Sequence, residues 1–294
     1  MFYYRPSDEI VSNTNLGRFA NSLGISVKDL YRRADNDPEW FWPRVIDDLG
    51  IEFFRKYDRV VDLSDGVEWA RWFTGGEINI EFNAVERYSS SGKTAIIYEA
   101  ESGENSKLSY SELNRKVSSL ASTLLDLGIR KGDRVAVYMP FNANSAIAFY
   151  SILRIGAVAV PMFSGYGLSA VRGRIEDSGA KLLITSRSYE RKGKSIDMAG
   201  VAEKISIKTI MDGDSGKFYR FEDAVSGSKN VETERTGSED PAIMLYTSGT
   251  TGKPKGTVHV HGGALVNIAK EVKYYMDLKE EDVLHWITDL GWMM

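Results

Sequence analysis

The sequence predicts an α/β protein in which helices cover both faces of a mostly parallel β-sheet, preceded by a helical lead-in. From residue 93 onward, short apolar runs typical of buried strands alternate with helical segments, as parallel strands joined by crossover helices require. Residues 1–92 instead show loosely helical spacing, interrupted by Pro38 and Pro43. A length of 294 residues suggests about two domains. We therefore expect one domain at 1–92 and a second at 93–294.

The individual elements follow from local patterns in chain order. Apolar and β-branched runs predict strands at 94–100, 107–110, 134–139, 157–163, 181–185, 206–210 and 241–246. The clearest helix begins after Ser109, which has Glu112 at capping-box spacing, and ends before Gly128. Two further helices are expected at 143–155 and 169–178. The polar, Gly- and Ser-rich residues 211–240 are expected to form a surface connection.

Composition and charge narrow the classes of function. Lys and Arg total 37 against 41 Asp and Glu, and the net charge of −4 argues against a duplex-binding protein. The chain has no cysteine, and His259 and His261, expected on one strand, have no third ligand at a suitable spacing, so no metal site is predicted. Asp8 and Glu9 interrupt the apolar core that a signal peptide needs, and polar residues break the most apolar stretch, 146–163. We expect a cytoplasmic protein that binds neither nucleic acid nor membrane.

The strongest functional motif is the loop that follows the strand at 241–246. Its ten residues (TSGTTGKPKG) contain three glycines, four hydroxyl side chains and two lysines. Glycine lets backbone N–H groups turn toward an anion, and lysine neutralises charge, so this composition suits a polyphosphate. Two residues separate Gly249 from Gly252 where a P-loop has four, so this is not a Walker A motif. The predicted ATP phosphate-binding residues are Thr247, Ser248, Gly249, Thr250, Thr251, Gly252, Lys253 and Lys255.

A second glycine motif offers a rival interpretation. Residues 165–170 (GYGLSA) fit the G-x-G-x-x-A fingerprint of dinucleotide-binding folds, between an expected strand and an expected helix. That fingerprint requires an acidic residue at the end of the next strand, about twenty residues further on. The strand at 181–185 leads instead into Thr185 and Ser186, which argues against a nicotinamide or flavin oxidoreductase.

Residues 246–256 (YTSGTTGKPKG) resemble the signature loop of the adenylate-forming superfamily, which includes the AMP-forming acyl-CoA synthetases. Other segments resemble the acetyl-CoA synthetase branch in the same order, namely 72–88 (WFTGGEINIEFNAVERY), 131–140, 154–167, 171–185 and 288–294 (TDLGWMM). The chain is thus similar to the N-terminal part of such an enzyme. It is expected to be truncated before the adenine-binding turn, the ribose-binding aspartate and the mobile C-terminal domain with its catalytic lysine.

The resemblance implies a two-step ligation. A carboxylic acid attacks the α-phosphate of Mg²⁺–ATP, giving an acyl-adenylate and pyrophosphate, and the thiol of coenzyme A then displaces AMP. The phosphate loop would hold the β- and γ-phosphates, by positioning and charge neutralisation. The implied cofactors and partners are ATP, Mg²⁺, coenzyme A and a small carboxylic acid, and a homo-oligomer is compatible with the resemblance.

Two further sets of residues carry over by position. Coenzyme A is expected near Phe163, Gly165, Arg191 and Lys194, and the acyl group near Trp292, Met293 and Met294. The branch usually has Arg where Lys194 stands, so a bidentate phosphate contact would become a point charge. Met adapts its shape, so the acyl length cannot be inferred from these residues. No catalytic residue is expected within the chain, which we expect to be inactive alone. A natural short protein that binds nucleotide or coenzyme A without catalysis is the alternative.

Overall fold

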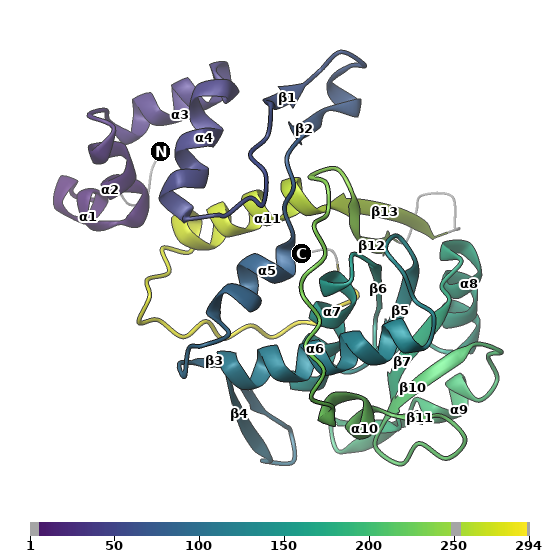
Figure 1. Cartoon of the computed structure of the whole chain (residues 1–294). Coiled ribbons are helices and arrows are strands. Elements are labelled where there is room, and N and C mark those ends of the chain that lie inside the picture. Colours follow the sequence, from purple (N-terminus) through teal and green to yellow (C-terminus); the bar gives the residue numbers. More distant parts are fainter. Residues whose placement is uncertain (1–5, 248–253, 293–294) are drawn as a thin grey trace. The chain divides into compact units, whose positions relative to one another are not determined.

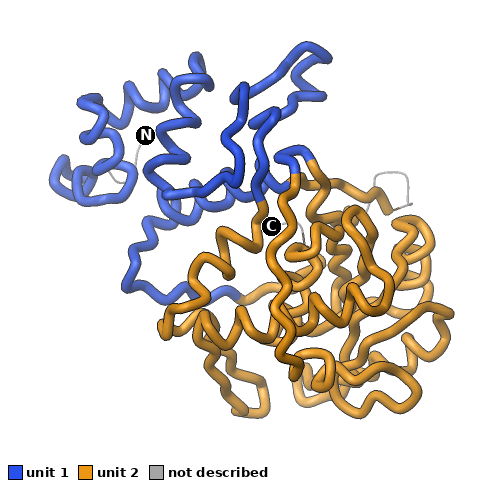
Figure 2. Tube along the Cα trace, viewed as in Figure 1, with its two compact units in different colours: residues 1–78, 237–239, 261–286 blue, residues 79–236, 240–260, 287–294 orange. Residues whose placement is uncertain are grey.

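The computed structural model describes residues 6–247 and 254–292 (Figure 1). The chain divides into two compact units, each assembled from separate stretches of sequence (Figure 2). The first comprises residues 1–78, 237–239 and 261–286, and the second comprises 79–236, 240–260 and 287–294. These compact units do not test the predicted domain boundary at residue 92, which stays a prediction. Among the residues that the structure describes, no helix is both long and apolar enough to cross a bilayer.

The first unit begins with four helices, each preceded by a polar capping residue. They are α1 (Asp8–Asn13), α2 (Asn15–Ser22), α3 (Val27–Asn36) and α4 (Pro38–Leu49). Ser7, Thr14, Ser26 and Asp37 each accept a hydrogen bond from a backbone N–H of the first turn, which satisfies one of its free donors. Pro38 is the first residue of α4, but Pro43 lies inside that helix rather than interrupting it. Pro43 removes one hydrogen bond of the helix, while the neighbouring Trp40, Phe41 and Trp42 are partly buried and pack against a hydrophobic cluster.

The rest of the first unit consists of a small hairpin and a segment from far along the chain. The hairpin pairs β1 (Arg59–Asp62) with β2 (Arg71–Thr74), with the short helix η1 (Val67–Trp69) between them. The distant segment forms α11 (His261–Lys270) and the π-helix η3 (Glu271–Tyr275). Tyr274 stacks on Phe19 at 5.2 Å, and its hydroxyl donates to Asp48 at 2.7 Å. Because His261 begins α11, the expectation that it shares a strand with His259 is wrong.

The second unit contains the predicted sheet. Its strands are β5 (Arg134–Tyr138), β6 (Val158–Met162), β7 (Leu182–Ser186), β10 (Lys208–Asp212), β11 (Tyr219–Arg220), β12 (Pro241–Thr247) and β13 (Lys255–Val260). They lie in the order β11-β10-β7-β5-β6-β12-β13, and every pair is parallel except β12 with β13. The predicted fold class, an α/β protein with a mostly parallel sheet, is therefore confirmed.

Helices cover both faces of this sheet, as predicted. One core cluster contains residues of α6 (Tyr110–Asp126), α7 (Ala143–Arg154) and α10 (Phe221–Ser226), and the other contains residues of α8 (Leu168–Ser178) and α9 (Ala199–Ala202). Successive residues of β5 alternate between the clusters, since Val135 and Val137 belong to the first and Ala136 and Tyr138 to the second. Near the first cluster lie α5 (Ile80–Ala84) and the short helix η2 (Glu86–Tyr88).

Two hairpins complete the second unit. They pair β3 (Thr94–Glu99) with β4 (Asn105–Ser109) and β8 (Ser188–Arg191) with β9 (Lys194–Asp197). Ser109 and Glu112 form the predicted capping box at the start of α6. The expectation that residues 211–240 form only a surface connection is wrong, because α10 and its buried Phe221 lie within them. One apolar turn inside a polar stretch was too short a signal to detect.

Candidate functional site

The predicted phosphate loop and two of the predicted coenzyme A residues, Phe163 and Gly165, follow neighbouring strands at the same edge of the sheet. Phe163 directly follows β6, and β12, which runs parallel to β6, ends at Thr247. Ligands of open α/β sheets bind outside the carboxyl ends of the strands. Cross-strand pairing places Thr247 opposite Lys255, so the two described flanks of the loop lie together. The predicted residues Ser248, Gly249, Thr250, Thr251, Gly252 and Lys253 lie outside the described residues.

The strand that leads into this loop is anchored at Tyr246. Its ring is 6% exposed, and its hydroxyl donates to the Asp177 carboxylate of α8 at 2.6 Å. Burial, and then the hydrogen bond to Asp177, raise the pKa of the Tyr246 hydroxyl far above its ordinary value. The hydroxyl therefore stays protonated and acts as a permanent donor that holds the end of β12 against α8.

The structure brings Phe163, Arg191 and Trp292 together. The Arg191 guanidinium lies 5.6 Å from the centre of the Phe163 ring, and the Trp292 ring lies 6.1 Å from it. Gly165 is close as well, because a Cβ at this position would stand 2.6 Å from Cε1 of Phe163. One predicted acyl-pocket residue thus shares a cluster with three predicted coenzyme A residues. Met293 and Met294 lie outside the described residues.

Lys194 lies across a tight turn from Arg191, as their register in the β8–β9 hairpin shows. The two turn residues, Lys192 and Gly193, have φ of 52° and 67°, as a two-residue hairpin turn requires. Their backbone N–H groups donate to the carboxylate of Glu101 at 2.7 and 3.1 Å. This turn therefore holds an anionic group with two consecutive amides, flanked by basic side chains.

Asp289 and Ser164 form a contact that sequence reasoning missed. The Asp289 carboxylate accepts hydrogen bonds from the backbone N–H and the hydroxyl of Ser164, at 3.0 and 2.6 Å. It also accepts from the N–H of Gly291 at 3.0 Å, and a Cβ on Gly291 would stand 2.2 Å from the Phe163 nitrogen. Residues 289–292 thus pack directly against the loop after β6. The D-x-G spacing of 289–291 is the one local signal of such a turn.

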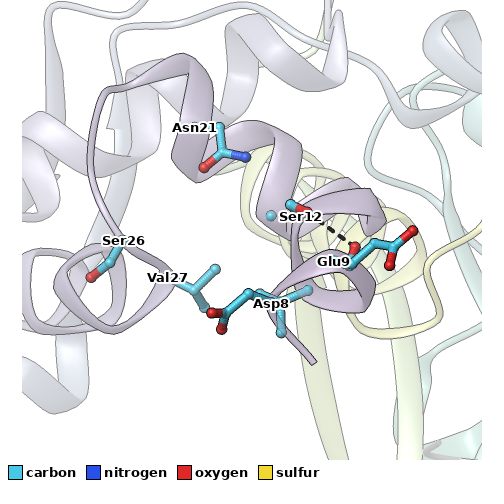
Figure 3. Close-up of a pocket in the computed structure, with 8 residues that line it drawn as sticks. Asp8, Glu9, Ser12, Asn21, Ser26 and Val27 are labelled. Atoms are coloured by element: carbon cyan, nitrogen blue, oxygen red, sulfur yellow. Dashed lines mark hydrogen bonds between the residues drawn. The ribbon is translucent and has the colours of Figure 1, made fainter. Parts of the chain in front are cut away.

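A surface hollow of about 430 Å³ lies elsewhere, between the first three helices (Figure 3). It is lined by Asp8, Glu9, Val11, Ser12, Gly17, Asn21, Ser26 and Val27. The Ser12 hydroxyl donates to the Glu9 carbonyl and Ser26 caps α3, so these polar groups serve the helices. Across the described ranges, no group of three or more His, Asp or Glu side chains is placed to hold a metal ion. The candidate site is therefore the edge of the sheet, not this hollow.

Comparison with known families identifies the class of protein. The family model described as "AMP-binding enzyme" matches residues 83–294, and the one described as "Acetyl-coenzyme A synthetase N-terminus" matches residues 27–84. The chain belongs to the AMP-binding enzyme family, with an acetyl-coenzyme A synthetase-like N-terminal segment. The resemblance drawn from the sequence motifs is thereby confirmed.

Individual relatives agree with this family. The chain is 35% identical over 287 residues to 3-hydroxypropionyl-coenzyme A synthetase of Sulfurisphaera tokodaii, covering 91% of this chain and 43% of the relative. It is 33% identical over 299 residues to acetyl-coenzyme A synthetase of Cupriavidus metallidurans, covering 94% and 45%. Acetoacetyl-CoA synthetase from Streptomyces lividans has a similar structure, with a TM-score of 0.90 at 26% identity, covering 98% of this chain and 48% of that one. The chain spans under half the length of these relatives.

Proposed function

We propose that this chain is the N-terminal part of a ligase that activates a carboxylic acid with ATP and transfers the acyl group to coenzyme A. The observation that supports this most directly is the shared edge of β6 and β12, where the candidate phosphate loop begins and where Phe163 lies in contact with Arg191 of the β8–β9 hairpin. Consecutive half-reactions need the two ligands at one place, and this edge offers both sets of groups. Residues 93–294 would supply this part of the ligase domain, after a separate region at 1–92.

The side chains have distinct proposed roles. Thr247, Lys255 and the residues between them would hold the β- and γ-phosphates, with Lys255 neutralising charge as pyrophosphate separates. Arg191 and Lys194 would contact phosphates of coenzyme A beside Phe163 and Gly165. Trp292, Met293 and Met294 would line the acyl group. Mg²⁺ would arrive with ATP, because this ion is usually held through substrate phosphates and few protein carboxylates.

The test measures the two half-reactions separately in the whole protein. We expect Lys255→Ala to slow ATP–pyrophosphate exchange by about 1.5–3 kcal/mol, because one charge-assisted phosphate contact is lost. Thioester formation from pre-made acyl-adenylate should change little, since pyrophosphate has left before that step. Lys229→Ala is the matched control, because Lys229 is 71% exposed and pairs with the exposed Asp126. Equal losses in both half-reactions would contradict the assignment.

The choice of carboxylic acid and the activity of residues 1–294 alone need separate measurements. A panel of short and medium carboxylic acids in the exchange assay gives the substrate class. Residues 1–294 alone should form neither adenylate nor thioester, because catalysis by positioning fails when part of the constellation is absent. Binding of ATP or coenzyme A by the whole protein without turnover would favour the non-catalytic alternative. Cytoplasmic location and homo-oligomer formation stay predictions.

A further inference from the structure

The interior of the second unit contains an arginine whose guanidinium lies against two aromatic rings. Arg174 of α8 is 7% exposed, and its guanidinium lies 4.1 Å from the ring centre of Tyr166 and 5.4 Å from that of Tyr246. It donates to the Tyr166 hydroxyl at 3.1 Å and to the Ala170 carbonyl at 2.9 Å. Among the described residues it forms no ion pair, and its Nε has no hydrogen-bond partner. A buried cation so placed depends on both rings.

Each of the two rings leads to a different part of the candidate site. Tyr246 directly precedes Thr247, the first residue of the candidate phosphate loop. Tyr166 lies in the loop after β6, where it meets Phe163 edge-to-face at 5.5 Å, and Phe163 in turn lies under Arg191. Two cations and three rings therefore form a continuous row of contacts from the β8–β9 hairpin to the end of β12. We call the five residues Arg191, Phe163, Tyr166, Arg174 and Tyr246 the cation–aromatic ladder.

We propose that Arg174 is a positioning residue that fixes the end of β12, where the candidate phosphate loop begins, relative to the loop after β6 that contains the candidate coenzyme A residues, through its contacts with Tyr246 and Tyr166. The identity of the two ligands rests on the proposed function, whereas the contacts of Arg174 with the two tyrosines do not depend on it. A planar guanidinium can stack on a ring with each face, whereas an ammonium group cannot, so lysine is a poor substitute here. Arg174 touches neither ligand in this scheme and acts only through the two tyrosines.

The ladder predicts a specific division of kinetic effects in the whole protein. Arg174→Met should raise the KM for ATP and the KM for coenzyme A by about tenfold each, since one cation–aromatic contact is lost on each side. Arg174→Lys should raise both KM values less than Arg174→Met does, but should not leave them at the wild-type values. Tyr246→Leu should raise mainly the KM for ATP, and Tyr166→Leu mainly the KM for coenzyme A. If these residues only stabilised the fold, the two tyrosine substitutions would not affect the two KM values differently.

Arg172→Met is the matched control on the same helix. Arg172 is exposed and donates to the Lys204 carbonyl at 3.0 Å, away from both tyrosines, so neither KM should change. If Arg174→Met and Arg172→Met give the same two KM values, the proposal is wrong. It is also wrong if Tyr166→Leu and Tyr246→Leu both raise the two KM values equally.

A readout without turnover separates this proposal from the proposed function. Amide hydrogen exchange in the whole protein should become faster at 163–166 and at 255–257 in Arg174→Met, while β10 in the same sheet stays protected. If the wild type makes no adenylate but this exchange pattern appears, the function is wrong and the coupling stands. If exchange rises throughout the unit or at neither segment, the coupling fails even in an active enzyme.

Discussion

The two edges of the parallel sheet differ in whether their basic side chains form ion pairs. At the amino ends of the strands, basic groups have carboxylate partners. The pairs are Lys131–Asp240 at 3.0 Å, Lys181–Asp133 at 2.6 Å and Arg154–Glu81 at 2.6 Å. At the carboxyl-end edge, Arg191, Lys194 and Lys255 form no ion pair among the described residues. Ion pairs at one edge stabilise the fold, whereas basic side chains without a carboxylate partner at the other are suited to phosphate groups.

The buried pair of Glu81 and Arg154 shows what the amino-end edge contributes. Both side chains are fully buried, and Glu81 also accepts from the Thr233 hydroxyl while Arg154 donates to the Asn114 side chain. Burial raises the pKa of Glu81, and the charge and hydrogen bond of Arg154 oppose that rise. The pair thereby joins the start of the second unit to α7 and to the segment around residue 233, which has no regular secondary structure.

The largest predicted effect comes from breaking this pair. Arg154→Met should lower the free energy of unfolding by about 3–5 kcal/mol, because it leaves a buried carboxylate without its partner. Lys181→Met is the control at the same edge and should cost under about 1 kcal/mol, since Lys181 is 56% exposed. Urea unfolding of both variants measures the difference. Similar losses would mean that burial does not distinguish the pairs, and the comparison of the two edges would lose its basis.

Much of the fold could be predicted because its signals are local. The Ser109–Glu112 capping box and the continuous apolar run of β5 are signals within a few residues, so the local sequence alone predicts them. The assembly of the first unit could not be predicted, since the Asn15 N–H donates to Asp277, 262 residues away. No periodicity carries information about such a contact.

The candidate site also has one part that the sequence predicted and another that it did not. Loop composition predicted the phosphate site, whereas the proximity of Arg191 to Phe163 depended on the family resemblance. The Ser164–Asp289 contact joins two polar residues 125 positions apart, neither of which stands in a pattern that marks its partner. Side chains that meet only through tertiary structure are the part that sequence reasoning misses.

The second prediction tests how tightly the carboxyl-end edge is packed. Gly291→Ala should cost about 2 kcal/mol of stability, because the added Cβ would stand 2.2 Å from the Phe163 nitrogen and 2.5 Å from the Met162 carbonyl carbon. The amide of Ser164, which donates to Asp289, should then exchange faster with solvent. Gly173→Ala is the control, because that exposed helical position has no atom within 4 Å of a new Cβ and alanine favours helix. A stable Gly291→Ala protein with unchanged exchange at Ser164 would refute close packing there.

The third prediction uses the unpaired charge of Arg191. Arg191→Ala should raise the KM for coenzyme A by about tenfold, or about 1.4 kcal/mol, and leave the KM for ATP nearly unchanged. The loss should largely vanish with dephospho-coenzyme A if the contact is to the 3′-phosphate. Steady-state kinetics of the whole protein with both thiols measures this. A wild type that does not discriminate between the two thiols would exclude a 3′-phosphate contact here.

The smallest predicted effect concerns the carboxylate that already occupies the hairpin turn. Glu101 accepts from the N–H groups of Lys192 and Gly193, which lie between the proposed coenzyme A residues Arg191 and Lys194. Glu101→Gln removes a competing negative charge from an exposed position, so the KM for coenzyme A should fall by about threefold, or about 0.7 kcal/mol. Glu104→Gln, on the same β3–β4 hairpin, makes the same charge change without a hydrogen bond to the turn and serves as the control. A higher KM in Glu101→Gln would instead mean that Glu101 holds the turn in its binding conformation, and Glu101 would then be a structural carboxylate at this edge, as Asp289 is.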